Sequence, residues 1–199
     1  SGNSKWWINS GAYFYSENGL GRTVLGELSS LNAWRVAYNA ANSEDTDNGY
    51  HPQNIFRLLS RSKWQNQDSQ VYFQIKKDNL STSTNRNQSN GLLLMTRYVD
   101  SNNLYYVGVR VDGTSIIKKK IGGVYYTLSQ KQLPGITGVY NVTTNPNMLP
   151  HNSWIGLRSV VTNKDSNTVN IKQYIDFGKT GNWTLVADIN DTGSQYGAS

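Results

Sequence analysis

The stretch that decides the fold is LYYVGVRVDGTSIIKKKIGGVYYTL, which runs from Leu104 to Leu128. Two turn signals, Asp112-Gly113 and Gly122-Gly123, divide it into three segments dominated by β-branched and aromatic residues. Such segments form strands, and Asp-Gly or Gly-Gly pairs favour two-residue hairpin turns. The stretch therefore predicts an antiparallel meander of three strands.

The unusual feature of this meander is a run of three lysines inside a strand. With two-residue turns at both ends, lysine stems lie across from tyrosine rings, and an ammonium near a ring face gains a modest attraction. Two interpretations stay open: a solvated outer strand whose lysines protect a sheet edge, or a platform for a ligand. The predicted rows are Tyr106–Lys119–Tyr126 on one face and Tyr105–Lys120–Tyr125 on the other.

Strand-like segments separated by turn residues recur along the whole chain, and no long helical pattern appears. The apolar run Gly91–Val99 fits a central strand buried on both faces, whereas Trp34–Ala40 fits a strand or a short helix. About ten such segments predict an all-β protein, an antiparallel two-sheet jelly-roll sandwich in a single domain over residues 1–199. The other predicted strands are Gly11–Tyr15, Asn54–Ser62, Ser69–Asn79, Ser153–Asn163, Thr168–Phe177 and Asn182–Asn190.

Charge and composition limit the classes of molecule that this chain is expected to bind. The 199 residues carry a net charge of +6 and no Cys. The basic residues form no tail or arm, which disfavours nucleic acid as the partner and favours attraction to another anionic polymer, such as an acidic polysaccharide. No apolar stretch approaches the roughly 20 residues that a membrane-spanning helix needs.

Several segments together resemble the concanavalin A-like lectin and glucanase jelly rolls, including LamG-type modules. They are NIFRLLSRSKW, GLLLMTRYVDSNNLYYVGVRVDG, IIKKKIGGVYYTL, WIGLRS and GNWTLVADINDTG, which span most of the chain. The resemblance implies a secreted or cell-surface protein that binds a polysaccharide without turning it over. It does not fix the function, because this fold carries lectins, hydrolases, lyases and adhesion modules.

A search for catalytic groups leaves one enzymatic alternative. Glycosidases of this fold need paired carboxylates at strand spacing, and the only three glutamates, Glu17, Glu27 and Glu44, lack such partners. A jelly-roll polysaccharide lyase needs a Tyr or His base and cations that neutralise a uronate, and these residue types are present. The chain lacks the strand motifs of known lyases. Carbohydrate binding without catalysis is therefore the main prediction, and a polysaccharide lyase is the alternative.

Polar and cationic side chains near the expected sheet centre are the candidate ligand-binding residues. Arginine and lysine would neutralise an anionic sugar, and tyrosine would stack on its ring. The set is Gln74, Arg97, Tyr106, Arg110, Lys119 and Tyr126.

An acidic loop is the candidate metal site. Asp45 and Asp47 alternate before Gly49, with Glu44 alongside, and a loop of alternating oxygen ligands before a glycine turn can wrap Ca²⁺. Solvated carboxylates in Asx turns are the alternative. The sequence therefore predicts a structural Ca²⁺ held by these three residues.

The resemblance also calls for one more strand after Gly193, beside the N-terminal strand, and only six residues follow. The aromatic segment Gly11–Tyr15 would then be an open edge, which attracts another strand. We expect a homo-oligomer, a partner chain that donates a strand, or a shortened chain. A structural or adhesive subunit assembled by strand sharing is thus a third functional alternative.

Overall fold

The computed structural model describes residues 4–8 and 13–192. Contacts among the described residues group the chain into two compact units. The first consists of Ser1–Lys63 and Lys76–Asn87, and the second of Trp64–Ile75 and Gln88–Ser199. Each is described below by itself, and the single domain over residues 1–199 stays a prediction.

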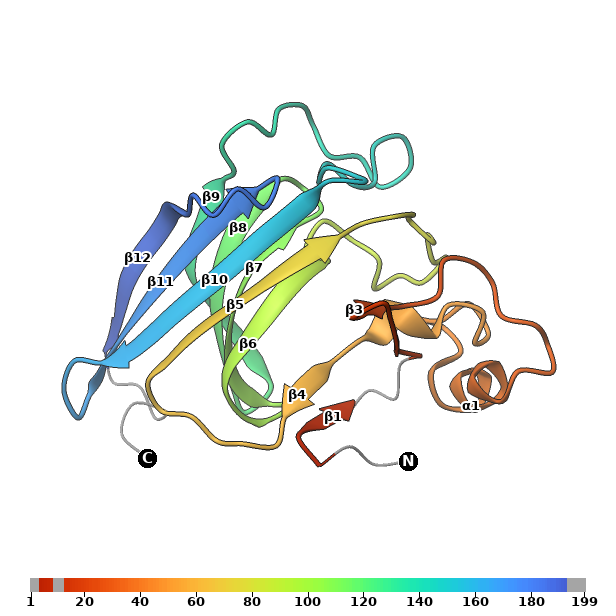
Figure 1. Cartoon of the computed structure of the whole chain (residues 1–199), viewed down its shortest axis with the longest axis horizontal. Coiled ribbons are helices and arrows are strands. Elements are labelled where there is room, and N and C mark those ends of the chain that lie inside the picture. The colour runs from red at the N-terminus through yellow and green to blue at the C-terminus, as the bar shows by residue number, and fades with distance from the viewer. Residues whose placement is uncertain (1–3, 9–12, 193–199) are drawn as a thin grey trace. The chain divides into compact units, whose positions relative to one another are not determined.

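The second unit is built from two four-stranded antiparallel sheets, which Figure 1 shows one in front of the other. This confirms the all-β class and the two-sheet sandwich. One sheet has the order β12-β11-β10-β5 and the other β6-β7-β8-β9. The strands are β5 (Gln67–Gln74), β6 (Gly91–Asp100), β7 (Asn103–Arg110), β8 (Thr114–Ile121), β9 (Val124–Gln132), β10 (Trp154–Asn163), β11 (Thr168–Phe177) and β12 (Thr184–Thr192).

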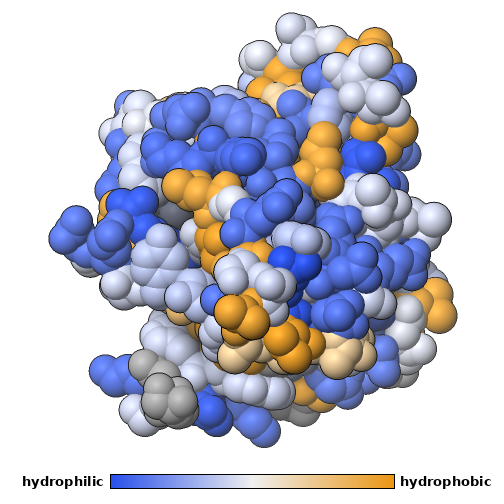
Figure 2. All heavy atoms as spheres, turned by 90° about the vertical axis from the view of Figure 1, so that its right-hand side faces the viewer, coloured by the Kyte–Doolittle hydropathy of each residue, from blue (hydrophilic) through white to orange (hydrophobic). Residues whose placement is uncertain are grey.

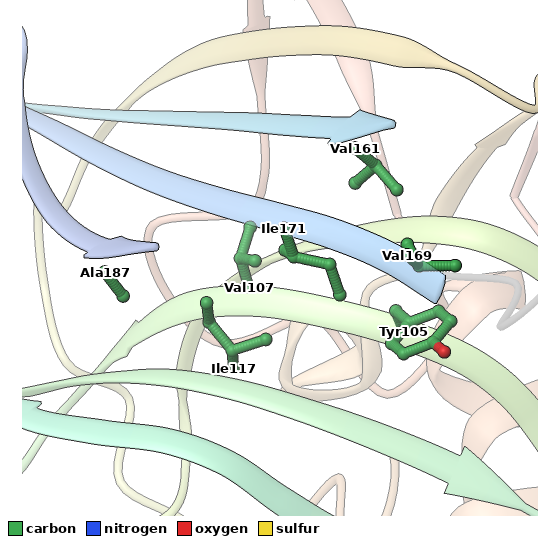
Figure 3. Packing of buried hydrophobic residues seen from close by; sticks show 7 residues of the cluster. All are labelled: Tyr105, Val107, Ile117, Val161, Val169, Ile171 and Ala187. Atoms are coloured by element: carbon green, nitrogen blue, oxygen red, sulfur yellow. The ribbon is translucent and has the colours of Figure 1, made fainter. Parts of the chain in front are cut away.

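The core of the sandwich lies between these sheets. Alternate residues of each strand point to the same face, so a strand that faces the core buries every second side chain. Figure 3 shows one cluster in which side chains from the two sheets meet, and all its members are buried. Tyr105, Val107 and Ile117 come from β7 and β8, and Val161, Val169, Ile171 and Ala187 from β10, β11 and β12.

The turn between β7 and β8 has three residues and not two. The Gly113 amide donates to the Arg110 carbonyl at 3.0 Å, and Gly113 adopts a left-handed φ of 79°. Asp112 stabilises the turn, because its carboxylate accepts from the Thr114 amide at 3.0 Å and pairs with Arg110 at 2.9 Å. A type I turn followed by a left-handed glycine is the usual three-residue hairpin, and it shifts the pairing by one residue.

Both predicted rows are therefore wrong in their pairing of β7 with β8, because neither Tyr106 with Lys119 nor Tyr105 with Lys120 is a pair. Tyr106 pairs with Lys118, and Lys119 pairs with Tyr105. The second turn was predicted correctly, since Lys119 pairs with Tyr126 and Lys120 with Tyr125. The actual rows are Tyr105–Lys119–Tyr126 on the core-facing side and Leu104–Lys120–Tyr125 on the outer side.

The shifted register explains the lysine run. Lys119 points toward the facing sheet, where its ammonium lies 2.8 Å from the Asp191 carboxylate of β12. The Tyr105 hydroxyl donates to the same carboxylate. Both ion-pair partners are almost fully buried, at 12% and 8% side-chain exposure. The middle lysine thus joins the two sheets, while its neighbours point outward.

The prediction that Gly91–Val99 is a central strand is also wrong. These residues lie in β6, which is the edge strand of its sheet. Pairing with β7 breaks between Thr96 and Asp100, where Arg97 has a left-handed φ of 47°. The run is apolar because one face meets the core through Leu92 and Leu94, while Leu93 and Met95 pack in a second cluster with Leu104, Tyr106 and Ile116.

The first unit contains short elements. Two small antiparallel pairs are formed by β1 (Trp6–Ile8) with β4 (Leu58–Ser60) and by β2 (Tyr15–Glu17) with β3 (Leu20–Arg22). The helix α1 (Ala33–Asn42) begins after Asn32, whose side chain accepts from the Trp34 amide. Trp34–Ala40 is therefore helical.

Much of the predicted strand Asn54–Ser62 is not a strand. A 3₁₀ turn, η1 (Pro52–Ile55), replaces its first part, because proline fits the first helical position, and β4 keeps three residues. In the predicted edge Gly11–Tyr15, Gly11 and Ala12 lie outside the described residues, as does any strand after Gly193. Tyr15 belongs to β2.

Among the described residues no helix is long and apolar enough to cross a membrane. Figure 2 shows polar side chains over most of the face it presents, with apolar side chains in separate patches.

The Lys119–Asp191 pair gives a stability prediction. Asp191→Ala leaves a nearly buried ammonium and the Tyr105 hydroxyl without their acceptor, so the free energy of unfolding should fall by about 3–5 kcal/mol in urea denaturation. The double variant Lys119→Met, Asp191→Leu should regain most of this loss, because an apolar pair needs no partner. Asp188→Ala, at a half-exposed pair with Lys172, is the control and should cost about 1 kcal/mol or less. Equal losses for Asp191→Ala and Asp188→Ala would contradict a cross-sheet role.

Candidate functional site

The outer face of the β5–β12 sheet carries a group of aromatic side chains at one end of the strands. Tyr72 is on β5, Trp154 begins β10, and Trp183 lies just before β12. Val71 and Phe73 pack in the core, so Tyr72 between them points outward. We call Tyr72, Trp154 and Trp183, together with Lys179, the aromatic face.

A glycine allows two of these rings to lie on the sheet. Gly156 pairs with Tyr72 across the strands. A Cβ atom at Gly156 would lie 2.7 Å from a ring carbon of Tyr72 and 3.0 Å from one of Trp183. The centroids of these two rings are 5.4 Å apart. Any side chain at position 156 would push the rings off the strand, so the glycine is required for this arrangement.

A lysine lies beside the rings on a tight turn. Lys179 has a left-handed φ of 59° between Gly178 and Gly181, which also have positive φ. Its ammonium is 5.1 Å from the Trp154 ring centroid and 5.7 Å from that of Tyr72. Among the described residues this ammonium has no carboxylate partner. The aromatic face therefore carries an exposed cation next to ring surfaces.

A buried carboxylate fixes the turn beneath this lysine. Asp176 is 2% exposed and accepts from the Tyr72 hydroxyl at 2.7 Å, the Thr180 hydroxyl at 2.7 Å and the Gly181 amide at 2.8 Å. Burial by itself raises the pKa of Asp176, but the hydrogen bonds from Thr180, Tyr72 and Gly181 outweigh it, so the pKa lies below its usual value. The hydrogen bond that Tyr72 donates to Asp176 raises the pKa of the Tyr72 phenol. Asp176 thus holds both Tyr72 and the turn that carries Lys179.

Further along the same outer face an arginine is already paired. Arg158 donates to both carboxylate oxygens of Asp68, and its hydrogen bond holds the pKa of Asp68 below the usual value. The Arg158 guanidinium also lies 5.3 Å from the Tyr174 ring centroid. This cation is neutralised within the chain, unlike Lys179.

The outer face of the other sheet carries a second cationic and aromatic group. Tyr125 is 54% exposed, and its ring centroid lies 4.7 Å from the Lys120 ammonium and 5.6 Å from that of Lys118. The Tyr106 ring stands edge-on to it at 6.1 Å. Burial, with the neighbouring Tyr125, raises the pKa of Tyr106 to about 12. We call Lys118, Lys120 and Tyr125 the lysine–tyrosine surface.

The structure does not bring the six predicted ligand-binding residues together. Arg97, Tyr106 and Arg110 are each less than 10% exposed, and Arg97 and Arg110 hydrogen-bond within the chain. Lys119 is held by Asp191, and Tyr126, 49% exposed, lies in the core-facing row beside it. Gln74 is across from Trp154 and lies at the border of the aromatic face, where it donates to the Asn152 carbonyl.

The sequence reasoning missed Trp154, Trp183 and Lys179. Tyr72 and Trp154 are far in the chain from Asp176 and Lys179, and they meet them only because β5, β10 and β11 are adjacent. A usable signal was present: Lys179 lies in a turn bounded by two glycines, and an aromatic residue stands at the end of each neighbouring strand.

In the first unit, the acidic loop borders an open cleft of about 490 Å³. The predicted metal ligands are engaged by the segment 81–85. The Glu44 carboxylate accepts from the Thr84 hydroxyl and that of Asp45 from Ser83. Asp47 accepts from the Thr82 amide at 3.0 Å and contacts His51 at 2.9 Å. The cleft is lined by Glu27, Ser43, Glu44, Asp47, Asn48, Tyr50, His51, Leu80, Thr82 and Ser83.

These contacts bear on the calcium prediction. Burial alone raises the pKa of Asp47, but hydrogen bonds from Thr82, His51 and Ser81 outweigh it and keep the pKa low, so the carboxylate is charged. Within residues 4–8 and 13–192, no three acidic or histidine side chains are grouped closely enough to hold a metal. Ca²⁺ would therefore have to displace the bonds to segment 81–85, and its binding stays a prediction.

Comparison with known proteins supports the fold. No family model matches the chain, and no curated protein matches it. A solved structure, the carbohydrate-binding module CBM66 from Bacillus subtilis, is similar with a TM-score of 0.51. It is 15% identical in sequence, and the match covers 94% of this chain and 80% of that one. At this identity the likeness shows a shared β-sandwich fold.

The low pKa of Asp176 predicts a pH dependence. A carboxylate whose pKa is lower in the folded than in the unfolded chain stabilises the fold above its unfolded pKa, about 3.9, and loses that contribution as pH falls through the folded value. Asp176→Asn should lower the free energy of unfolding by about 2–3 kcal/mol at pH 7, and by less at pH 3. Urea denaturation at both pH values measures this. The same loss at pH 3 as at pH 7 would show that the charge of Asp176 contributes nothing.

The calcium prediction is tested by melting temperature. If Glu44, Asp45 and Asp47 bind Ca²⁺ in the folded chain, millimolar Ca²⁺ should raise the melting temperature and excess EDTA should lower it. Asp45→Asn should abolish the shift, whereas Asp165→Asn, in the exposed turn before β11, should preserve it. A melting temperature unaffected by Ca²⁺ and EDTA would contradict the prediction.

Proposed function

We propose that this protein is a non-catalytic carbohydrate-binding module that takes an anionic polysaccharide on the aromatic face. The observation that supports this most is the juxtaposition of Tyr72, Trp154 and Trp183 with the unpaired ammonium of Lys179. The similar solved structure is itself named a carbohydrate-binding module. Because such polymers lie outside cells, we also propose an extracellular or cell-surface location.

The chemistry of a sugar ring matches this surface. One face of a pyranose presents C–H groups, which pack on an aromatic ring, while its hydroxyls remain available for hydrogen bonds. Carbohydrate recognition therefore needs rigid rings whose faces are accessible. Gly156 lets the rings lie against the sheet, and the bond from Tyr72 to Asp176 fixes one of them. A site that is already rigid loses little conformational entropy on binding.

The charge of Lys179 supports an acidic sugar as the ligand. A carboxylate or sulfate on a stacked sugar would replace water as the partner of this ammonium, and a charge-assisted hydrogen bond is stronger than a neutral one. The net charge of +6 adds a long-range attraction to a polyanion.

The hydrogen bond that Tyr72 donates to Asp176 supports binding without turnover. A lyase would need a phenolate or another base at the sugar ring. The hydrogen bond to Asp176 raises the pKa of Tyr72 and so keeps its proton in place. We therefore propose Tyr72 as a stacking group on the aromatic face.

The proposal is tested by titration with alginate, dextran sulfate and neutral dextran. The unaltered protein should bind the two anionic polymers more tightly than neutral dextran. Trp183→Ala should weaken binding at least tenfold, about 1.4 kcal/mol, and Lys179→Gln should weaken binding of the anionic polymers alone. Trp64→Ala removes an exposed tryptophan elsewhere and is the matched control. No binding of any of the three, or equal binding by the Trp183→Ala variant, would reject the proposal.

A further inference from the structure

We infer that the polysaccharide bound on the aromatic face continues along β10 and β11, where its next sugar is uncharged and packs on Tyr174 beside the Arg158–Asp68 ion pair. The preferred ligand is then a polymer that places a neutral sugar next to an acidic one. This inference rests on the proposed function, and it names the class of polymer that the same site selects.

Tyr174 and Arg158 lie one row further along the outer face that carries the aromatic face. Strand pairing places Asp176 across from Gly156, beneath the rings, and Tyr174 across from Arg158 in the next row of that side. Two residues of a strand advance by about 7 Å at roughly 3.3 Å per residue, a length comparable to one sugar unit of an extended polysaccharide. The aromatic face lies at one end of the strands, so a polymer that follows β10 along the sheet crosses this row next.

This row offers the contacts that an uncharged sugar uses. Leu185 of β12 pairs with Tyr174 and is 50% exposed, so the two side chains provide apolar surface for the C–H face of a sugar ring. The Arg158 guanidinium lies 5.3 Å from the centroid of the Tyr174 ring and is held by the Asp68 carboxylate. An ion pair of this kind presents donors and acceptors together, and a sugar hydroxyl can use either.

The charges along these strands disfavour an acidic sugar in the same row. The strands β5, β10, β11 and β12, which the structure describes in full, contain only two cations. Arg158 is paired with Asp68, and Lys172 lies 3.5 Å from Asp188. The two carboxylate side chains are nearly half exposed, at 48% and 43%. A carboxylate on the next sugar would therefore lie beside like charges, and such contacts are a common means of rejecting a wrong partner.

Two adjacent positions on one face thus differ in the charge that they accept. The aromatic face offers the Lys179 ammonium to an acidic sugar, whereas the next row offers a ring and a neutralised ion pair. A chain with acidic and uncharged sugars side by side satisfies both positions, and a chain that is acidic throughout satisfies only the first. Specificity of this kind combines an attraction at one position with a repulsion at the next.

The test compares two tetrasaccharides by calorimetric titration. In one, glucuronate alternates with uncharged N-acetylglucosamine, and in the other every sugar is a uronate. The unaltered protein should bind the alternating tetrasaccharide about fivefold more tightly, a ratio typical of one exposed charge contact. Tyr174→Ala should weaken this binding about tenfold through loss of the ring contact, and Tyr174→Phe, which keeps the ring, should bind like the unaltered protein.

Asp68→Asn tests the charge of the ion pair directly. It keeps the size of the side chain but frees the charge of Arg158, so affinity for the polyuronate tetrasaccharide should rise about fivefold and the preference should disappear. Asp165→Asn makes the same change of net charge in the exposed turn between β10 and β11, and it should alter neither affinity. Equal effects of Asp68→Asn and Asp165→Asn would overturn the inference.

The remaining outcomes separate the inference from the proposed function. Equal or tighter binding of the polyuronate tetrasaccharide by the unaltered protein, still weakened by Trp183→Ala but unaffected by Tyr174→Ala, would overturn the inference and leave the proposed function in place. Failure of both tetrasaccharides to bind would reject the proposed function, and the inference with it. Circular dichroism of each variant confirms that it has folded.

Discussion

The three-residue turn at Val111–Gly113 is the constraint on which the rest of the sandwich depends. Its left-handed glycine adds one residue to the hairpin and so decides which side of β8 each lysine faces. With that register, Lys119 points inward and meets Asp191 and Tyr105 from two different sheets. With a two-residue turn, Lys118 and Lys120 would point into an apolar core without such an acceptor. Because strand side chains alternate, a single residue in one turn inverts a whole face.

On both sheets a buried carboxylate fixes the position of side chains that lie on the outer face or next to it. Asp176 binds Tyr72 and the turn of Lys179, and Asp191 takes the middle lysine so that its neighbours can surround Tyr125. In each case the carboxylate is enclosed by donors, and on the aromatic face the Lys179 ammonium lies beside the rings of Trp154 and Tyr72. Rigid rings beside the Lys179 ammonium are suited to flat, acidic ligands and support an anionic glycan as the proposed partner.

The sequence predicted the fold class well because that class depends on local patterns. Alternating apolar residues and Gly or Asp turns identified most strands of the second unit. The predicted strand Ser153–Asn163 matches β10 to within one residue, and the predicted strand Thr168–Phe177 matches β11. Predictions failed where local patterns were ambiguous. The Asn54–Ser62 segment alternates well but begins after Pro52. The strand β6 has the sequence of a central strand because apolar groups cover both its faces, but it lies at the edge of its sheet.

The sequence by itself therefore determined the strands, the positive charge and the presence of aromatic and lysine residues in the meander. Only the tertiary structure decided which of them act together. Tyr72 and Trp154 meet the local Asp176–Lys179 turn through strand order, which no local pattern encodes. Arg97 and Arg110, chosen for their charge, proved to be buried and bonded within the chain. The physical reason is that side-chain type is a local property, whereas exposure and pairing depend on contacts between residues far apart in the chain.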